Sequence, residues 1–339
     1  MGVVNVVTTA LCLLSNLNQE PPSLTFQRSF FTLYNIDRVL CPPVRKNEVN
    51  FYLYTRKTTS TPEQLFLNDP STLSKSHFST SKPTVFFIHG FLESSASHDA
   101  TAMKKAQLER ADCNMILVDA KLLFAGPNYF TGAANVEAVG KYIAEFIDFL
   151  VSQGVNLSDV EVTGMSLGGQ TTGIVGQNVK SGKLPKILAF DPAGPLFNFY
   201  PDHKRLDKSD AELVIVIHSN SLLNGYYESC GHVDFWINGK PFLQPGCDPV
   251  DVNLRTSFDI PELIFCSHFL SYRVGAYSIM NPQSFPSRKC DSYNNYKSGQ
   301  CNNNDLQYVG DNVTSSASGD YYITLGDDVY SKFSAVGIQ

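Results

Sequence analysis

The sequence has no block of Lys or Arg and few charges of either sign. Only 17% of its 339 residues are charged, and the formal net charge is −6. A nucleic-acid interface needs clustered basic residues, so this composition disfavours that class of function. A mildly acidic surface is also poorly suited to strong attraction to anionic lipid.

The sequence also lacks an apolar run long enough to cross a bilayer. Val3 to Leu14 (VVNVVTTALCLL) has the length of a secretory h-region and is too short for a spanning helix. We expect a signal peptide over residues 1–18, no transmembrane anchor and a secreted, extracellular protein. The alternative is a disordered or truncated N-terminus.

None of the eight cysteines forms a C-x-x-C, and no His pair accompanies them at zinc-finger spacing. Disulfides are therefore expected rather than a zinc site, which fits export. Cys12 would leave with the signal peptide, so an odd number remains and one thiol stays free unless cleavage falls elsewhere. Two N-x-S/T sequons, Asn156 to Ser158 and Asn312 to Thr314, are compatible with a secreted glycoprotein.

The sequence does contain an alternation of apolar runs and helical patterns. Strands are expected at 51–55, 84–88, 115–118, 186–190, 213–217 and 321–325, and an amphipathic helix at 133–153. This alternation predicts an α/β fold with a mostly parallel central sheet and helices on both faces. We expect one domain over residues 19–339, with its core at about 51–325. Chemistry in such folds lies beyond the carboxyl ends of the strands.

The most informative stretch is Val160 to Gly173 (VEVTGMSLGGQTTG). It places G-x-S-x-G between a strand and a helix, the context of a nucleophile elbow in the α/β-hydrolase fold. A Cβ at Gly164 or Gly168 would collide with the crossing strand and helix. Ser166 is therefore the candidate nucleophile. The alternative is a glycine-rich turn whose Ser only caps the helix.

A serine nucleophile needs a base and an orienting acid, in the chain order Ser, Asp or Glu, His. Asp191 directly follows a buried strand and is the candidate acid, although an Asp there could simply cap a turn. His268, His218 and His232 compete as the base. We favour His268, which is the last His and follows Cys266 at the start of a predicted helix.

An oxyanion hole needs two backbone N–H groups aimed at the developing charge. One should belong to Leu167, directly after the nucleophile. The other should come from the turn after an early strand, which indicates Phe91 in IHGF.

Several motifs together resemble the pancreatic-lipase family of animal lipases and phospholipases A1. They are HGF, GMSLGG, FDPAGP, RLDKSDAELVIVIHS, GHVDFWINGKPFLQPGC and CSHFLSYR, in the family's order across roughly residues 51–325. Carried over by position, the resemblance implies the triad Ser166, Asp191 and His268 with the oxyanion donors Phe91 and Leu167. No cofactor is required by this chemistry.

The resemblance also implies a calcium-binding loop at residues 202–210. Asp207 and Asp210 would supply carboxylates, and Asp202 and Arg205 would supply backbone or side-chain oxygens, which suit Ca²⁺. Four acidic or polar residues in a loop are, however, more often simply solvated.

By resemblance, two disulfides are expected. Cys247 and Cys266 would close an amphipathic lid, with a plain stapled loop as the alternative, and Cys290 would pair with Cys301. Cys41 with Cys113 is a further guess, which leaves Cys230 unassigned.

The chain departs from the family pattern in three ways. Met165 stands where the family usually has His, Ala120 stands where it often has Trp, and the chain ends soon after Leu325. We expect the first change to reduce or alter activity at most. The third leaves no room for the β-sandwich domain of some members, so recruitment by colipase or heparin is not implied.

These residues predict a secreted serine esterase that hydrolyses acyl esters of lipids at a membrane or emulsion surface, as a triacylglycerol lipase or a phospholipase A1. The short lid favours phospholipase A1-like or broad esterase activity. The alternative is a catalytically weak or inactive lipid-binding or storage protein of the kind seen in insect yolk proteins, which lack the serine. A peptidase has no support beyond the shared triad logic.

Overall fold

The computed structural model describes residues 48–125, 128–249 and 260–338. The predicted signal peptide, Cys41 and the middle of the predicted lid lie outside the described residues.

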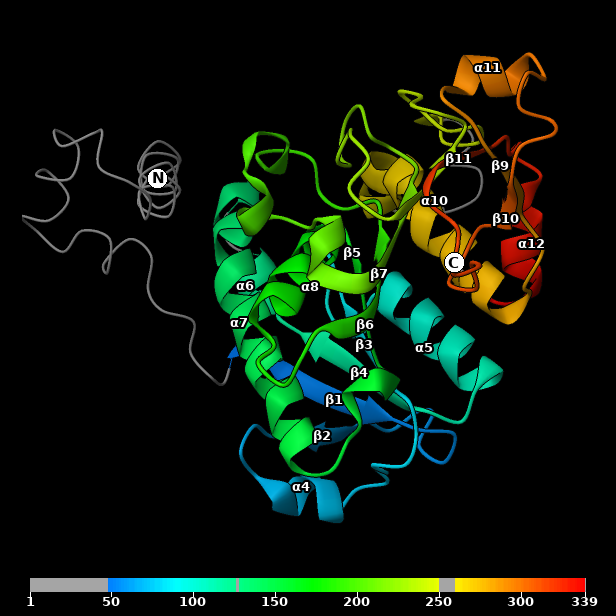
Figure 1. The fold of residues 1–339 in the computed structure, drawn as a ribbon. Helices are drawn as coiled ribbons and strands as arrows, with labels where there is room; N and C mark the ends of the chain where they lie inside the picture. Colours follow the sequence, from blue (N-terminus) through cyan, green and yellow to red (C-terminus); the bar gives the residue numbers. More distant parts are fainter. Residues whose placement is uncertain (1–47, 126–127, 250–259, 339) are drawn as a thin grey trace, which may run out of the picture.

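In the described part of the chain, eleven strands form one sheet in the order β10-β9-β11-β8-β7-β6-β5-β3-β4-β1-β2 (Figure 1). The strands are β1 Asn50–Tyr54, β2 Glu63–Leu65, β3 Thr84–Ile88, β4 Asn114–Asp119, β5 Val160–Met165, β6 Leu184–Phe190, β7 Ala211–His218, β8 Val233–Ile237, β9 Pro286–Lys289, β10 Leu306–Tyr308 and β11 Gly319–Ile323. All pairings from β4 through to β11 are parallel. The antiparallel pairings lie at the two edges.

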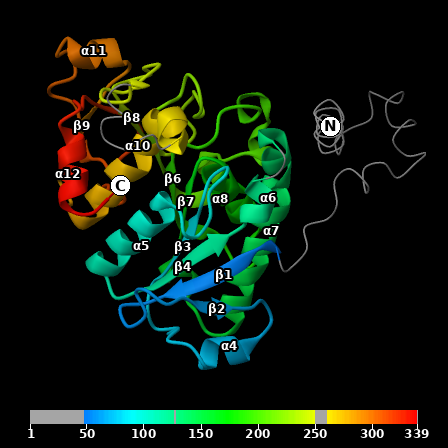
Figure 2. The same cartoon turned by 180° about the vertical axis from the view of Figure 1, so that it is seen from behind.

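Helices cover both faces of this sheet (Figures 1 and 2). The helices are α4 Pro70–Ser74, α5 His98–Arg110, α6 Lys121–Ala125, α7 Tyr129–Ser152, α8 Leu167–Asn178, α10 Ile260–Met280, α11 Tyr293–Lys297 and α12 Val329–Ala335, with 3₁₀ turns η2 Leu157–Asp159, η3 Phe197–Phe199, η4 Asp202–Lys204 and η5 Lys208–Asp210. Helices α7 and α8 pack on each other over one face, and α5 and α10 pack on each other over the other.

Strand β3 shows why one continuous apolar run serves two layers. Alternate side chains of a strand point to opposite faces. Phe86 and Ile88 join the core under α7 and α8, whereas Val85 and Phe87 join the core under α5 and α10. A strand buried on both faces must be apolar throughout, which is the pattern TVFFI. The predicted α/β-hydrolase architecture is confirmed.

Most predicted elements appear within a few residues of their expected positions. The helix predicted at 133–153 begins earlier, at Tyr129, because the Asn128 side chain accepts a hydrogen bond from the Thr131 backbone N–H at 3.1 Å and caps the first turn. Helix α10 also begins earlier than expected. His268 therefore lies inside this helix rather than at its start.

Two predicted disulfides are confirmed, and one is wrong. Cys247 pairs with Cys266, and Cys290 pairs with Cys301. Cys113 is a free, buried thiol between α5 and β4, where burial raises its pKa to about 11, so it does not pair with Cys41. Cys230 is likewise free and buried.

Candidate active site

Ser166 lies in a sharp turn between β5 and α8. Its φ is 56°, in the left-handed region that a side-chain-bearing residue adopts at a cost of about 1–3 kcal/mol. Backbone hydrogen bonds hold the turn. The Ser166 N–H donates to the Phe190 carbonyl at 3.0 Å, and the Ser166 carbonyl accepts from the N–H groups of Ala193 at 3.0 Å and Gln170 at 3.1 Å. This backbone tie joins the ends of β5 and β6.

The turn needs glycines where the sequence predicted them. A Cβ at Gly168 would lie 2.0 Å from the Ile88 carbonyl oxygen of β3. A Cβ at Gly164 would lie 2.4 Å from the Gly168 carbonyl oxygen. Real Cβ atoms do not approach backbone so closely, so only glycine lets strand, turn and helix pack at this distance.

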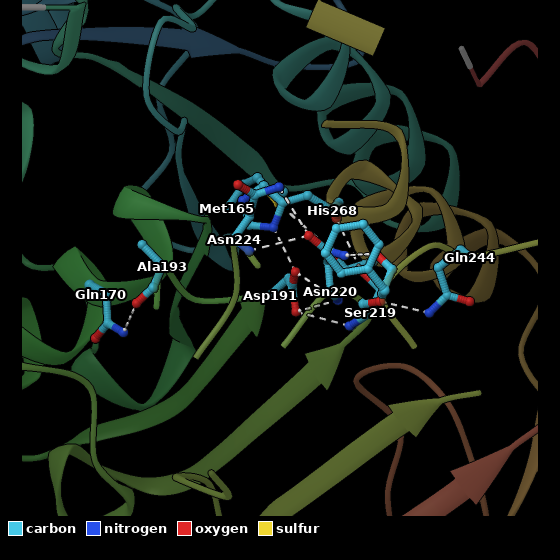
Figure 3. Close-up of polar contacts among 11 residues, drawn as sticks. Met165, Gln170, Asp191, Ala193, Ser219, Asn220, Asn224, Gln244 and His268 are labelled. Atoms are coloured by element: carbon cyan, nitrogen blue, oxygen red, sulfur yellow. Dashed lines mark hydrogen bonds and ion pairs between the residues drawn. The ribbon is translucent and has the colours of Figure 1, made fainter. Parts of the chain in front are cut away.

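Asp191 lies at the end of β6 and contacts His268 (Figure 3). The Asp191 Oδ2 atom lies 2.6 Å from His268 Nδ1, and both side chains are buried. The carboxylate also accepts from the backbone N–H groups of Ser219 at 2.9 Å and Asn220 at 3.0 Å. Behind it, a Cβ at Gly225 would lie 2.4 Å from Asp191 Oδ1, so the carboxylate is fixed on several sides.

A buried polar network also holds the backbone at His268. The Ser219 hydroxyl donates to the His268 carbonyl at 3.1 Å. The Gln244 amide in turn donates to the Ser219 carbonyl at 2.6 Å and to the Ile237 carbonyl at 3.0 Å (Figure 3). These bonds tie α10 to the ends of β7 and β8. Sequence analysis did not single out Ser219 or Gln244, because nothing in a sequence marks an isolated Gln as buried.

Ser166 and His268 both line a cavity of about 270 Å³. Its walls are mostly apolar and comprise Phe91, Glu93, Tyr129, Ser166, Pro195, Asn224, Phe265, His268 and Phe269. A neighbouring cavity of about 340 Å³ shares Phe91, Glu93, Phe265 and Phe269 with it. Together they offer apolar space beside a serine and an imidazole.

The two predicted oxyanion donors lie beside Ser166. Leu167 is the first residue of α8, where a backbone N–H has no partner within the helix. Phe91 lines the cavity, and its neighbour Gly90 packs so closely that a Cβ there would lie 3.0 Å from the Ser166 Cβ. His89 braces this turn, with Nδ1 2.9 Å from the Gly90 carbonyl and Nε2 accepting the Ala120 N–H at 3.0 Å. Burial lowers the pKa of His89, which keeps it neutral.

The two competing histidines have other partners. His218 Nε2 lies 2.7 Å from Asp234 Oδ1, and its ring stacks on Trp236 with centroids 3.8 Å apart. His232 Nδ1 accepts the Val214 N–H at 3.0 Å. Neither side chain lines the cavity, so the contacts of both histidines are structural.

Met165 packs behind the nucleophile. Its side chain is fully buried, and its sulfur lies 3.6 Å from the Ser271 hydroxyl of α10. The residue fills the space between the elbow and the helix that carries His268. It does not contact Asp191 or replace a proposed triad member.

The oxygens of the predicted calcium loop are already engaged by other groups. The Asp202 carboxylate pairs with the Arg205 guanidinium, and Asp207 and Asp210 cap η5 reciprocally. The Gln177 amide nitrogen donates to the backbone carbonyls of Asp202 at 3.3 Å and Arg205 at 3.0 Å. Burial raises the pKa of Asp210 to about 7.

Among the described residues, no group of three or more His, Cys, Asp or Glu side chains is arranged to hold a metal ion. The loop as placed therefore does not fit a calcium ion unless Gln177 moves away. Calcium binding stays a prediction, and the chemistry proposed below uses no cation.

Glu93 places in the cavity wall a carboxyl group that the sequence did not reveal. Its Oε2 atom accepts the Gly90 N–H at 2.8 Å. Burial, followed by the nearby charge of Asp99, raises the pKa of Glu93 well above its usual value. Burial likewise raises the pKa of Asp99 to about 7. The only hint in the sequence was its position two residues after the IHGF motif.

Comparison with known proteins gives several matches. A family model described as Lipase matches residues 30–328. Lipase member H from Rattus norvegicus is 32% identical over 75% of this chain and 53% of that protein. Inactive pancreatic lipase-related protein 1 from Mus musculus is 32% identical over 76% and 56%, and pancreatic triacylglycerol lipase from Sus scrofa is 33% identical over 75% and 58%.

The chain spans about half the length of these curated relatives. Solved structures match more weakly. One, a phospholipase/carboxylesterase from Dyadobacter fermentans, is 17% identical with a TM-score of 0.32 over 43% of this chain and 69% of that one. Because this TM-score is low, we assign the fold from the sheet topology and not from the similarity to this structure.

Proposed function

The chain belongs to the Lipase family, and from that premise we propose that it is a secreted serine esterase that hydrolyses acyl esters of lipids. The observation that carries the proposal is the 2.6 Å contact between His268 Nδ1 and Asp191 Oδ2, with His268 and Ser166 in the wall of one cavity. An imidazole held by a buried carboxylate beside a strained serine is the arrangement that acyl transfer requires.

In the proposed reaction, Ser166 Oγ attacks the acyl carbonyl carbon and His268 Nε2 takes the hydroxyl proton. Asp191 accepts the Nδ1–H hydrogen bond, which fixes the tautomer and stabilises the imidazolium. The N–H groups of Phe91 and Leu167 bind the oxyanion, and each such donor contributes about 10²–10³ in rate in comparable enzymes. His268 then gives the proton to the leaving alcohol, and water attacks the acyl-enzyme by the same route.

The surroundings of the cavity suit a substrate presented by a lipid surface. Several large apolar side chains stand exposed near it, namely Leu92, Leu222, Leu223 and Ile264. Leu92 and Ile264 line the neighbouring cavity, and Leu222 and Leu223 directly precede the cavity residue Asn224. Exposed apolar side chains grouped around a pocket favour contact with lipid. Within this class, the short loop between Cys247 and Cys266 favours phospholipid as the substrate.

Extracellular localisation has independent support. Disulfides persist in oxidising compartments, and the described residues contain two. The asparagines of both sequons, Asn156 and Asn312, are exposed and accessible to glycosylation. No helix in the described ranges has both the length and the apolar character needed to cross a bilayer.

A catalytically inactive lipid-binding protein is the second candidate. Two observations favour it: inactive pancreatic lipase-related protein 1 is as similar to this chain as the pancreatic triacylglycerol lipase, and Met165 replaces the usual His before the nucleophile. Met165 lies behind Ser166 rather than in the cavity, so we favour the enzyme.

The Ser166→Ala variant tests this choice. Removing the nucleophile should lower kcat on a p-nitrophenyl acyl ester by about 10⁶-fold, as in other triad hydrolases. Thermal unfolding should change little, because only a hydroxyl at the cavity wall is lost. Reaction of the wild type with a fluorophosphonate probe, analysed by mass spectrometry, should modify Ser166.

Ser287→Ala is the matched control, since Ser287 is a buried serine on strand β9, far along the sheet from β5, and its hydroxyl donates to the Gln307 carbonyl. Its activity should equal that of the wild type. The enzyme proposal would be rejected if the folded wild type hydrolysed no ester of any chain length and did not react with the probe. The lipid-binding alternative would then hold. Released fatty acid from triglyceride emulsions and from phospholipid vesicles would identify the preferred substrate.

A further inference from the structure

Glu93 closes the turn that carries Phe91. Its backbone N–H donates to the Gly90 carbonyl at 3.4 Å, while its carboxyl oxygen accepts the Gly90 N–H at 2.8 Å. Between them, Leu92 has a φ of 63° and is 61% exposed. Such strain persists only where surrounding contacts determine the backbone strongly. The Glu93 side chain supplies one of these contacts.

The Glu93 carboxyl also lies close to the nucleophile. A Cβ built on Gly90 would lie 2.6 Å from Glu93 Oε2 and 3.0 Å from the Ser166 Cβ. The carboxyl oxygen and Ser166 therefore border the same small space. A negative charge at that distance would oppose the oxyanion that forms during acyl transfer.

Asp99 is the group that allows Glu93 to stay neutral. It lies in the first turn of α5 and is fully buried, and its Oδ2 atom accepts no N–H or O–H from the described residues. The nearby charge of Asp99 adds to burial in raising the pKa of Glu93. Two neighbouring buried carboxyl groups strongly oppose each other's ionisation, so one of them keeps a proton. Asp99 Oδ1 accepts the Ala100 N–H at 2.7 Å, which favours Asp99 as the ionised partner and Glu93 as the acid.

We propose, as an extension of the proposed function, that Glu93 is a positioning residue of the active site. In its protonated form, held by Asp99, it fastens the Gly90–Phe91 turn against Ser166 and so aims the Phe91 N–H at the oxyanion. Loss of the proton at alkaline pH places a negative charge beside the oxyanion and repels Asp99 from the turn.

The other charged or titratable groups around the pair do not neutralise it. On α10, Arg273 forms a bidentate ion pair with Glu262 at 2.7 and 2.9 Å, and Tyr272 is buried beside Arg273. His98 on α5 lines the neighbouring cavity. In the described part of the chain, no Lys, Arg or His forms an ion pair with Glu93 or Asp99.

His89 and His268 also face this region. His89 is a neutral imidazole engaged with the backbone of the turn, and His268 is engaged with Asp191. His89 supplies no positive charge to the carboxyl pair, and the ion-pair partner of His268 is Asp191, so retention of one proton is what keeps Glu93 uncharged.

The test is the pH profile of kcat/KM on a soluble p-nitrophenyl ester, from about pH 5 to about pH 10, for Glu93→Gln and Glu93→Ala. The Gln carboxamide can accept the Gly90 N–H and donate to Asp99, but it cannot ionise. We expect near wild-type activity at neutral pH and a flattened alkaline limb. Glu93→Ala should lose about 10²-fold in kcat with KM little changed, the usual consequence of a misplaced oxyanion donor.

Asp99→Asn supplies a separate readout. Without the neighbouring carboxylate, Glu93 gives up its proton more easily, so the alkaline limb should move to lower pH. Circular dichroism and thermal unfolding of each variant are used to check that the fold is retained. If Glu93→Ala does not fold, the pH profile of Glu93→Gln alone decides whether the proposal holds.

An active wild type whose alkaline limb is unchanged in Glu93→Gln would overturn the positioning role and leave the proposed function intact. Glu93→Ala with more than a third of the wild-type kcat would do the same. A wild type that is inert and unlabelled by the fluorophosphonate probe would instead reject both proposals.

Discussion

At the scale of single residues, Asp191 combines a strained backbone with a fully enclosed carboxylate. Its φ is 39°, and its oxygens are surrounded by two backbone N–H groups, the His268 imidazole and the backbone of Gly225. Asn tolerates such a φ better than other residues, so it tests the charge without disturbing the turn.

Asp191→Asn should lower kcat by about 10⁴-fold, the loss seen for the equivalent change in another serine hydrolase. The Asn carbonyl can still accept the Ser219 and Asn220 N–H groups. Its NH₂ group, however, cannot accept the His268 Nδ1–H and therefore favours the wrong tautomer. Ester hydrolysis under saturating substrate measures the effect.

Asp234→Asn is the matched control, because Asp234 forms the other buried Asp–His contact, with His218. That variant should lose thermal stability while the folded fraction keeps its kcat. Retention of more than a tenth of the activity in Asp191→Asn would argue against the proposed role of Asp191.

At the scale of elements, the close crossing of β3 over the start of α8 determines where Ser166 stands. Gly168 allows this crossing, since its α-carbon faces the carbonyls of Ile88 and His89. The same two residues lead into the turn that carries Phe91. The spacing between β3 and α8 therefore fixes Ser166, the proposed nucleophile, and Phe91, a proposed oxyanion donor, together.

Gly168→Ala should destabilise the protein by about 3 kcal/mol, the upper part of the usual range for overpacking, because backbone and not a flexible side chain must move. The loss in kcat should exceed what the unfolded fraction explains. Gly326→Ala is the control, since its added Cβ would meet only the tip of the exposed Asp328 side chain. Denaturant unfolding and ester hydrolysis on both variants check this, and equal stabilities would contradict it.

At the scale of the whole molecule, a charge network lies at the amino ends of the central strands, away from the active site. Lys186 on β6 contacts Glu161 on β5 at 2.7 Å and Asp311 at 3.4 Å, and Asp311 also pairs with Arg110 at the end of α5. Glu161 and Ser166 stand at opposite ends of β5, roughly 15 Å apart at strand geometry. The network joins the sheet, α5 and the C-terminal region.

Lys186→Met should lower the free energy of unfolding by roughly 1–3 kcal/mol. The change removes a positive charge beside the largely buried carboxylates of Glu161 and Asp311. That figure is below the 3–5 kcal/mol of a fully buried pair, since the Lys186 side chain is 23% exposed. Activity at 25 °C should not change. Differential scanning calorimetry with Lys183→Met as an exposed control measures the difference. A Tm equal to that of the control would show that solvent already screens the network.

Much of the fold could be predicted from the sequence, because its signals are local. The run TVFFI coincides with β3, since a strand covered on both faces must be apolar throughout. The G-x-S-x-G turn was recognisable because the reasons for its glycines are local. Backbone atoms within a few residues of the serine, or on the adjacent strand β3, leave no room for a Cβ at these positions. The helix α7 followed from its periodicity, and only its capped first turn was missed.

The sequence by itself determined the layered α/β architecture, the elbow at Ser166 and the presence of an acid at the end of β6, because periodicity and turn chemistry act over short distances along the chain. Tertiary structure decided which histidine faces Asp191, that Cys113 stays a thiol, and that the charge of Asp99 acts on Glu93 near Ser166. Those contacts depend on how distant segments pack, and burial then changes the protonation of groups that look ordinary in the sequence.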